Sequence, residues 1–436
     1  MPLTLRSGRH HDRQILRLAL PAFGALVAEP LFLLTDTVIV SRLPAPALGA
    51  VGVASTVLSL LVGLCVFLAY GTTAAVARQI GAGNTRQAIR QGVDGLWLAA
   101  GVGLAIIVVV WPLAPWLVHL IGAEGELARQ AVTYLRISLP GVPAMLLVLA
   151  GTGVLRGMQD TRTPLLVSVG SFTLNAVLNV VFVLGLGWGV AGSAWGTVLA
   201  QSLAAAVYLA LIFGRQRAPL RPDLAGIRAA GSAGIALVIR TACLQAVLLI
   251  AAGVATRMGE DQIAAHTIAT RIWTLLALAL DAIAIAGQAI TGRALGAGDV
   301  AGTREATWRM VVWGIGSGVV LGLLVVVARP FVPAVFDANP FVTGELLDLL
   351  WTVAVLQPIA GVVFVLDGVL IGAGDQRYLA WAGVWTTLAY LPASLLVIVS
   401  GGGLVMLWMA LGVWMVARMI TLGLRAYGTR WLVTGA

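Results

Sequence analysis

A single carboxylic acid, Asp36, lies inside the apolar stretch LLTDTVIVSRL at residues 33–43. An acid at the centre of a membrane helix costs about 2.5–3.5 kcal/mol and usually marks a functional site. Loss of solvent disfavours the charged form of a carboxyl group, so an acid in such a place can exchange a proton near neutral pH. Asp36 is therefore a candidate proton-coupling residue. The alternative is an acid that pairs with an arginine or caps the backbone where the helix is broken.

One further acid and two prolines precede Asp36 in the same predicted helix. Glu29 precedes Asp36 by seven residues, which is two turns along one helical face. Pro21 and Pro30 lie in the same helix, where proline removes a backbone donor and favours a bend. We expect a bent helix that is a candidate moving part, with Glu29 equally suited to a functional and a structural role.

Amide and hydroxyl side chains in three other apolar stretches could surround the acid. Asn175 and Asn179 are four residues apart in LNAVLNVVFVLG and form one polar stripe on a helix. Their amides can hydrogen-bond to an acid on a neighbouring helix, although packing between helices is an alternative role. Tyr134 and Thr197 add hydroxyl groups. We predict that these side chains support Asp36.

Two further acids, Asp281 and Asp367, also lie in apolar stretches. Either acid could bind a coupling ion, but a structural role is favoured for both. They are therefore secondary candidates for the site.

The elements that must position these residues are membrane-spanning helices. The chain has 60% hydrophobic residues, 10% charged residues and a mean hydropathy of +0.98, far from the balance of a soluble domain. Its apolar stretches reach the length of about 18 residues that a helix needs to cross a bilayer, and they lack the alternation of barrel strands. We predict an all-α polytopic membrane protein with twelve transmembrane helices, at residues 14–40, 48–76, 91–118, 129–154, 164–185, 190–213, 233–256, 262–290, 306–328, 345–370, 379–400 and 403–424.

The 27 basic residues are all arginines, and their distribution predicts the orientation of the chain. With both chain ends on one side, 20 arginines are assigned to that side, including Arg17, Arg309 and Arg418 near the ends of their spans, and 4 to the other. Arg136, Arg240 and Arg271 are counted within predicted spans. The positive-inside rule then predicts a cell-membrane protein with both termini in the cytoplasm. Arginines in such short loops indicate contact with anionic membrane lipids and not with nucleic acid.

The sequence repeats itself with an offset of 215 residues. ARQIGAGN at 77–84 matches GRALGAGD at 292–299, and VLRGMQDTR at 154–162 matches VLIGAGDQR at 369–377. Parallel repeats of this kind occur in transporters that alternate access between two lobes. The alternative is that glycine-rich turns resemble one another by chance.

The repeat also predicts how the chain is divided. We expect an N-terminal lobe at 1–213 and a C-terminal lobe at 233–436, each with six helices, joined by a cytoplasmic linker at 214–232. Position 36 corresponds to Ala251, so the acid occurs in the first half only. The two lobes are therefore expected to differ in function.

Several longer motifs resemble those of a known family. EPLFLLTDT, RGMQDTRTPL, LNAVLNVVFVLGLGWGVAGSAWGTV and FVLDGVLIGAGD are similar to stretches of the multidrug and toxic compound extrusion (MATE) family, in its DinF branch. The resemblance covers nearly the whole chain. It implies two six-helix lobes around a central cavity that opens alternately to either side. It also implies cation-coupled export of amphipathic, often cationic small molecules, and we expect a monomer.

The resemblance assigns roles to individual residues. Asp36 matches the coupling acid of the DinF branch, and Pro21 matches the bend in its helix. The polar groups around the acid match Tyr134, Asn175, Asn179 and Thr197. Relatives often carry an aspartate where this chain has Asn179, so coupling is expected to depend on Asp36 alone. The second-lobe acids that the NorM branch uses for sodium are missing, with Ala360 in one expected place, which favours protons over Na⁺.

The sequence therefore predicts a proton-coupled multidrug efflux antiporter that holds no metal and no cofactor other than its coupling ion. One alternative is a flippase for lipid-linked precursors, although such proteins often have two extra helices and a more basic cavity. A sodium-coupled exporter is another. An intramembrane enzyme is disfavoured, because the histidines lack the spacing of a metalloprotease and no nucleophile elbow is present. The four histidines are His10, His11, His119 and His266.

Overall fold

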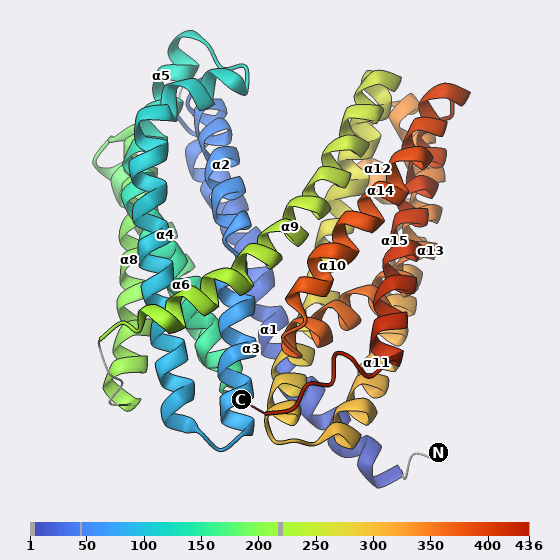
Figure 1. The fold of residues 1–436 in the computed structure, drawn as a ribbon. Coiled ribbons are helices and arrows are strands. Elements are labelled where there is room, and N and C mark those ends of the chain that lie inside the picture. Colours follow the sequence, from blue (N-terminus) through green and yellow to red (C-terminus); the bar gives the residue numbers. More distant parts are fainter. Residues whose placement is uncertain (1–4, 44–45, 217–220, 436) are drawn as a thin grey trace. The chain divides into compact units, whose positions relative to one another are not determined.

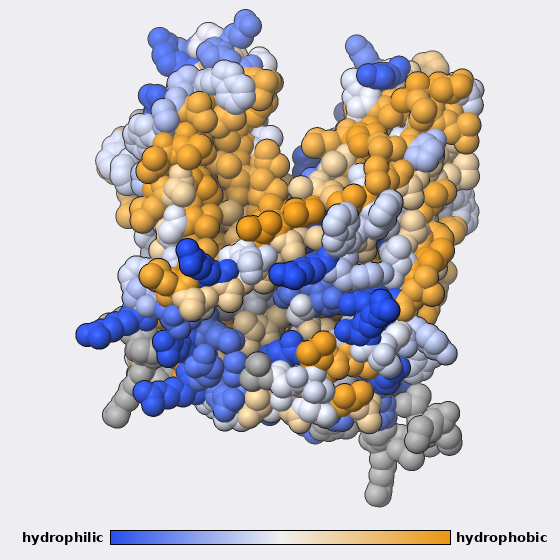
Figure 2. All heavy atoms as spheres, in the orientation of Figure 1, coloured by the Kyte–Doolittle hydropathy of each residue, from blue (hydrophilic) through white to orange (hydrophobic). Residues whose placement is uncertain are grey.

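The computed structural model describes residues 5–43, 46–216 and 221–435, and within these ranges it contains helices and no strand. Twelve segments of the described chain are long and apolar enough to cross a membrane, which confirms the predicted number. Figure 2 shows hydrophobic side chains over much of the visible surface of the helices, as a lipid-facing surface requires.

The helices of the first half of the chain are shown in blue to green in Figure 1. They are α1 (Leu5–Val40), α2 (Ala47–Leu64), α3 (Phe67–Gly81), α4 (Thr85–Leu120), α5 (Gly125–Ser138), α6 (Val142–Gly157), α7 (Arg162–Asn179) and α8 (Gly189–Gln216). Those of the second half are α9 (Leu224–Met258), α10 (Glu260–Gly296), α11 (Val300–Ala328), α12 (Val332–Val335), α13 (Pro340–Gly372), α14 (Gln376–Ser400) and α15 (Leu404–Tyr427).

Three of the predicted spans are interrupted in ways that their hydropathy did not indicate. The span predicted at 48–76 is divided into α2 and α3, with a break after Leu64. The span predicted at 129–154 contains a 3₁₀ turn, Leu139–Gly141, between α5 and α6, where Pro140 and Pro143 cannot donate backbone hydrogen bonds. The fifth span ends in a π-helical turn, Val180–Gly185, directly after Asn179.

The chain forms two compact units whose boundaries differ from the predicted domains. The first unit is Gly24–Gly234, and the second unit combines the chain up to Phe23 with Ile235–Ala436. Both boundaries therefore fall inside helices, within α1 and within α9. The predicted linker at 214–232 is helical from Leu224 onward.

A polar contact explains why the start of α1 belongs to the second unit. The Asp12 carboxylate accepts hydrogen bonds from Nε and Nη2 of Arg309 on α11, each at 2.6 Å, and from the Trp313 indole at 2.7 Å. Near the other chain end, the backbone N–H of Gly435 donates to the Leu295 carbonyl. Asp12 and Gly435 thus both contact residues of α10 or α11, which Figure 1 draws in yellow to gold.

Close glycine contacts repeat between the two units with the offset found in the sequence. In the first unit, Gly153 of α6 lies so near the Ala69 carbonyl of α3 that a Cβ atom would not fit. In the second unit, Gly368 of α13 lies equally near the Ala284 carbonyl of α10. Each residue of the second pair lies 215 residues after its counterpart in the first pair. Two further pairs follow the same rule: Gly157 with Thr73 matches Gly372 with Gln288, and Gly103 with Pro143 matches Gly318 with Pro358.

A close helix contact in the second unit joins α11 to α13. Gly314, Gly318 and Gly322 are spaced by four residues along one face of α11, and this face lies on the α13 backbone. Gly361 and Gly314 approach through their own backbone atoms, so neither position has room for a side chain. Small residues at this spacing let membrane helices pack closely, because lipid provides no hydrophobic drive between them.

This contact predicts a specific loss of stability. Gly361→Ala should lower the midpoint of thermal unfolding in detergent by roughly 5 °C, since overpacking a close contact costs about 2 kcal/mol. Gly316→Ala is the matched control, because a Cβ at Gly316 of α11 would meet nothing within 4 Å. Equal melting curves for the two variants would contradict the proposed packing.

Candidate functional site

The candidate site lies within the first unit, where α1, α7 and α8 bring polar side chains together. Asp36 on α1 is buried, with 7% of its surface exposed. Asn175 and Asn179 lie on one face of α7, which packs along α8. Ser193 and Thr197 are also four residues apart, on one face of α8. Helical spacing on each element therefore directs its polar groups to a common place.

The Asp36 carboxylate accepts two hydrogen bonds from uncharged donors. Asn179 Nδ2 donates to Asp36 Oδ1 at 2.5 Å, and Ser193 Oγ donates to the same oxygen at 3.0 Å. No arginine forms an ion pair with Asp36 in the parts of the chain that the structure describes. The alternative that Asp36 is held by a cationic side chain therefore finds no support in these contacts.

The hydrogen bonds continue from Asp36 as a chain. Asn179 Nδ2 also donates to Asn175 Oδ1 at 2.9 Å, and Asn175 Nδ2 donates to Thr197 Oγ1 at 3.0 Å. Gly196 makes room for the Asn179 amide, since a Cβ at this position would overlap its oxygen. The structure thus brings together four of the residues that the sequence singled out.

Tyr134 is buried beside this chain of hydrogen bonds. Its hydroxyl group lies near the hydroxyls of Ser55, Ser193 and Thr197, and within electrostatic range of Asp36. Ser55 and Ser193 are not among the residues that the sequence singled out, because serine is common in membrane helices. Ser193 does carry a signal, since it lies one helical turn before Thr197 within the motif GVAGSAWGTV.

The structure does not bring the other predicted helix-1 residues into the network. The Glu29 side chain is exposed and has no hydrogen bond to the network among the described residues, so it lies apart from the group it was predicted to support. Glu29 shares a helical face with Asp36, but this does not by itself bring Glu29 into contact with the network.

Pro21 and Pro30 lie within α1, which continues as one helix from Leu5 to Val40. The Thr35 and Thr37 hydroxyls donate to carbonyls one turn earlier on this helix.

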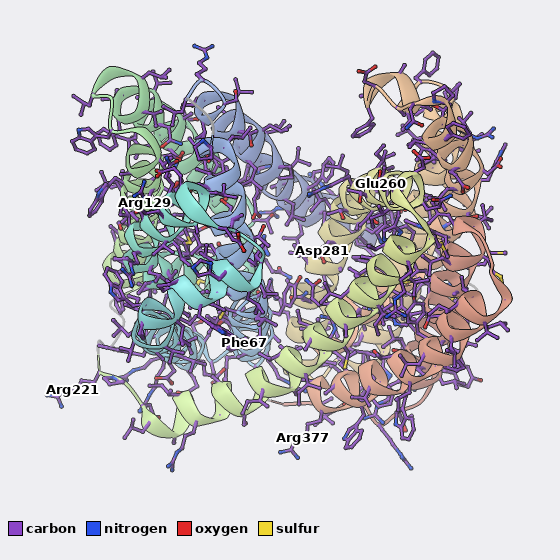
Figure 3. The ribbon with its side chains drawn as sticks, turned by 90° about the horizontal axis from the view of Figure 1, so that it is seen from above. Phe67, Arg129, Arg221, Glu260, Asp281 and Arg377 are labelled. Carbon is purple, nitrogen blue, oxygen red and sulfur yellow. The ribbon has the colours of Figure 1, made fainter. Side chains whose placement is uncertain are left out.

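Asp367 has the structural environment that was favoured for it. It pairs with Arg240 on α9 and with Arg418 on α15, whose Nη2 lies 3.1 Å from Asp367 Oδ2. All three side chains are nearly inaccessible to solvent. Asp281, labelled in Figure 3, is partly buried on α10. Neither acid is part of the Asp36 network, which belongs to the first unit.

One buried acid within a predicted span is not among the residues that the sequence singled out. Asp94 on α4 is 3% exposed and accepts a hydrogen bond from the backbone N–H of Asp223 at 3.1 Å. It is the fourth residue of the span predicted at 91–118, so its depth in the span did not single it out.

The described residues contain no group of three or more metal-ligating side chains. Ala360, at the position considered for a sodium-binding acid, is fully buried on α13.

Comparison with known proteins relates the whole chain to one family. The family model described as MatE matches residues 21–181 and again residues 236–396, and the two matched segments differ by the same 215 residues at both bounds. This double match agrees with the predicted repeat.

Individual relatives cover nearly the full length. Protein DETOXIFICATION 44, chloroplastic, from Arabidopsis thaliana is 30% identical, over 98% of this chain and 87% of its own. DNA damage-inducible protein F from Escherichia coli is 31% identical, over 94% of this chain and 91% of its own.

Solved structures share the fold. One is described as the outward-facing conformation of a multidrug resistance MATE family transporter of the MOP superfamily. It superposes with a TM-score of 0.87 at 24% identity over 96% of both chains. The family match, the relatives and the twelve spans agree. The chain belongs to the DinF branch of the MATE family, and it is a multi-pass membrane transporter and not an enzyme.

Proposed function

We propose that the chain exports amphipathic, cationic small molecules in exchange for protons, with Asp36 as the coupling acid. The observation that carries the proposal is a buried carboxylate that receives hydrogen bonds from Asn179 and Ser193 and has no ion-pair partner among the described residues. The family is one of multidrug transporters, and a relative from Thermotoga maritima, 25% identical, bears the name probable multidrug resistance protein NorM.

The hydrogen-bond geometry suggests how a proton acts on the network. Both donors reach Asp36 Oδ1, so Oδ2 is the oxygen on which a proton can be placed. An ionised carboxylate only accepts hydrogen bonds, whereas the protonated acid also donates one. Bonds to a charged acceptor are worth about 1.5–3 kcal/mol each, and neutralisation removes much of that difference. Protonation therefore loosens α1 from α7 and α8.

Transport follows from competition between proton and substrate. In the proposed cycle, a proton binds Asp36 from outside, α1 relaxes and substrate leaves. The lobes then rock inward, and the proton is released to the cytoplasm. Exchange requires that each ligand favours a different state, since a ligand shifts an equilibrium only by its differential affinity. A gradient of 100 mV supplies about 2.3 kcal/mol per charge, which sustains a concentration ratio of roughly 50-fold.

The proposal includes the placement of the chain. Its spans lie in the cell membrane with both termini in the cytoplasm, supported by the 20 arginines counted on the side of the termini. The transporter works as a monomer surrounded by lipid.

The first test removes the titratable proton without changing the shape of the side chain. In proteoliposomes, Asp36→Asn should abolish accumulation of a cationic dye driven by a pH gradient, so that a ratio of roughly 50-fold falls to about one. Asp299→Asn is the matched control, because this exposed acid caps α11, and asparagine caps a helix equally well. Undiminished dye accumulation by Asp36→Asn would refute the coupling role.

The same liposomes distinguish the alternatives. Wild-type protein under separately imposed proton and sodium gradients should respond to protons. Dye accumulation driven only by a sodium gradient would show that the coupling ion is Na⁺ and not the proton. Translocation of a lipid-linked sugar without dye transport would favour the flippase.

The second test concerns the amide that contacts Asp36. Asn179→Ala removes the donors to Asp36 and Asn175, so proton-driven dye efflux should slow by roughly 10–100-fold, the equivalent of about 1.5–3 kcal/mol. Dye affinity at equilibrium should change much less. Thr173→Val on the same helix is the control, because among the described residues the hydroxyl of this exposed threonine bonds only to the Val169 carbonyl. Equal efflux rates for the two variants would show that the network does not support coupling.

A further inference from the structure

A second polar site lies in the first unit, on elements that the Asp36 network does not use. It is an open pocket of about 600 Å³ at the start of α4 and the segment that leads into α9. The described lining residues provide guanidinium and amide donors, and Pro222 is the one apolar residue among them. The lining residues are Asn84, Arg86, Gln87, Arg90, Arg221 and Pro222.

The pocket retains positive charge. Arg90 Nη2 lies 3.0 Å from Asp223 Oδ2, so one of the three arginines in the described lining is paired. Arg86 and Arg221 form no ion pair with any residue that the structure describes. Arg86 and Arg90 are one helical turn apart on α4 and share a face. Two guanidinium groups therefore remain without a counter-charge in a concave site.

The walls of the pocket are fixed by buried contacts. Asp94 accepts the backbone N–H of Asp223, and the Asp223 carboxylate accepts the backbone N–H of Ala225 at the start of α9. Gly226 allows α9 to lie directly on Asp94, because a Cβ there would overlap the carboxylate. Further along α9, Gly234 packs on the Phe67 ring, which Figure 3 labels. The segment that carries Arg221 is therefore anchored to α4.

The location suits a ligand at the membrane surface. The pocket lies where two spanning helices begin, on the side that carries most of the arginines by sequence. Figure 2 shows hydrophilic side chains gathered in the lower part of the view, where Figure 1 draws the α3–α4 turn. Figure 3 shows Arg221 directed away from the helices. Basic pockets between helices at this depth bind lipid phosphate groups.

We propose that this pocket binds a phosphate-bearing anion, held by the guanidinium groups of Arg86 and Arg221. A guanidinium presents paired N–H donors in a plane, which fits two phosphate oxygens at once. The amides of Asn84 and Gln87 add donors for the remaining oxygens. The phosphate belongs to an anionic lipid headgroup or to a small soluble phosphate, and the two sources differ in how they reach the site.

The test measures binding to full-length protein freed of lipid in a neutral detergent. The probes are short-chain phosphatidylglycerol, short-chain phosphatidylcholine, glycerol phosphate and inorganic phosphate. The variant is Arg86→Gln with Arg221→Gln, both exposed, so that the fold is kept and elution from a sizing column is unchanged. The control is Arg42→Gln with Arg257→Gln, which removes the same charge from two exposed arginines outside the pocket.

At about 1 kcal/mol for each arginine, the double variant should bind phosphatidylglycerol roughly 30-fold more weakly than wild type, whereas the control should not differ. Preference for phosphatidylglycerol over both soluble phosphates would identify the lipid as the source. Equal competition by glycerol phosphate or inorganic phosphate, with the same loss in the variant, would identify a soluble phosphate. Equal binding of all probes by variant and wild type, or equal weakening in the control, would overturn the proposal.

Discussion

The hydrogen bonds that Asp36 accepts from Asn179 and Ser193 are the interaction on which the proposed coupling depends. They stabilise an ionised carboxyl without fixing its charge, because neither donor is a cation. A guanidinium partner would hold the carboxylate ionised over a wide pH range, and a purely apolar environment would keep it protonated. Neutral donors favour the ionised form less strongly than a guanidinium would, and the proposed function requires that a proton gradient selects between the two forms. In the proposed mechanism, protonation of Asp36 alters the packing of three helices, because α1, α7 and α8 meet at this buried carboxyl.

Asp367 shows how much the partners of an acid matter. It is as buried as Asp36 and also lies on an apolar helix, but Arg240 and Arg418 both pair with it. Removing one member of such a pair leaves a buried charge uncompensated, so these ion pairs hold the three side chains together. The arginines come from positions 127 and 51 residues away, on other helices. Sequence spacing therefore could identify both acids as unusual, but it could not tell which one has a cation beside it.

What the sequence predicted correctly depends on local regularities. The twelve spans follow from hydropathy, the repeat from one constant offset, and the joining of Asn175, Asn179 and Thr197 from helical spacing and motif resemblance. Long-range contacts account for what was missed. The start of α1 belongs to the second unit because Asp12 meets Arg309, 297 residues later in the chain. Ser193 has no unusual composition around it, and Asp94 gains its partner only when the segment before α9 folds back onto α4.

The repeat separates the requirements of packing from those of coupling. Glycines that allow helices to touch occur in both units at equivalent positions, as Gly153 and Gly368 do, because two similar backbones need the same close approaches. The polar network is not repeated: its five members correspond to Ala251, Tyr390, Ser394, Trp408 and Gly412 in the second half. None of these is ionisable near neutral pH. Packing tolerates symmetry, since it stabilises each unit independently. A coupled exchanger gains from a single titratable site, because a second acid that binds protons in another state would reduce the differential affinity on which exchange depends.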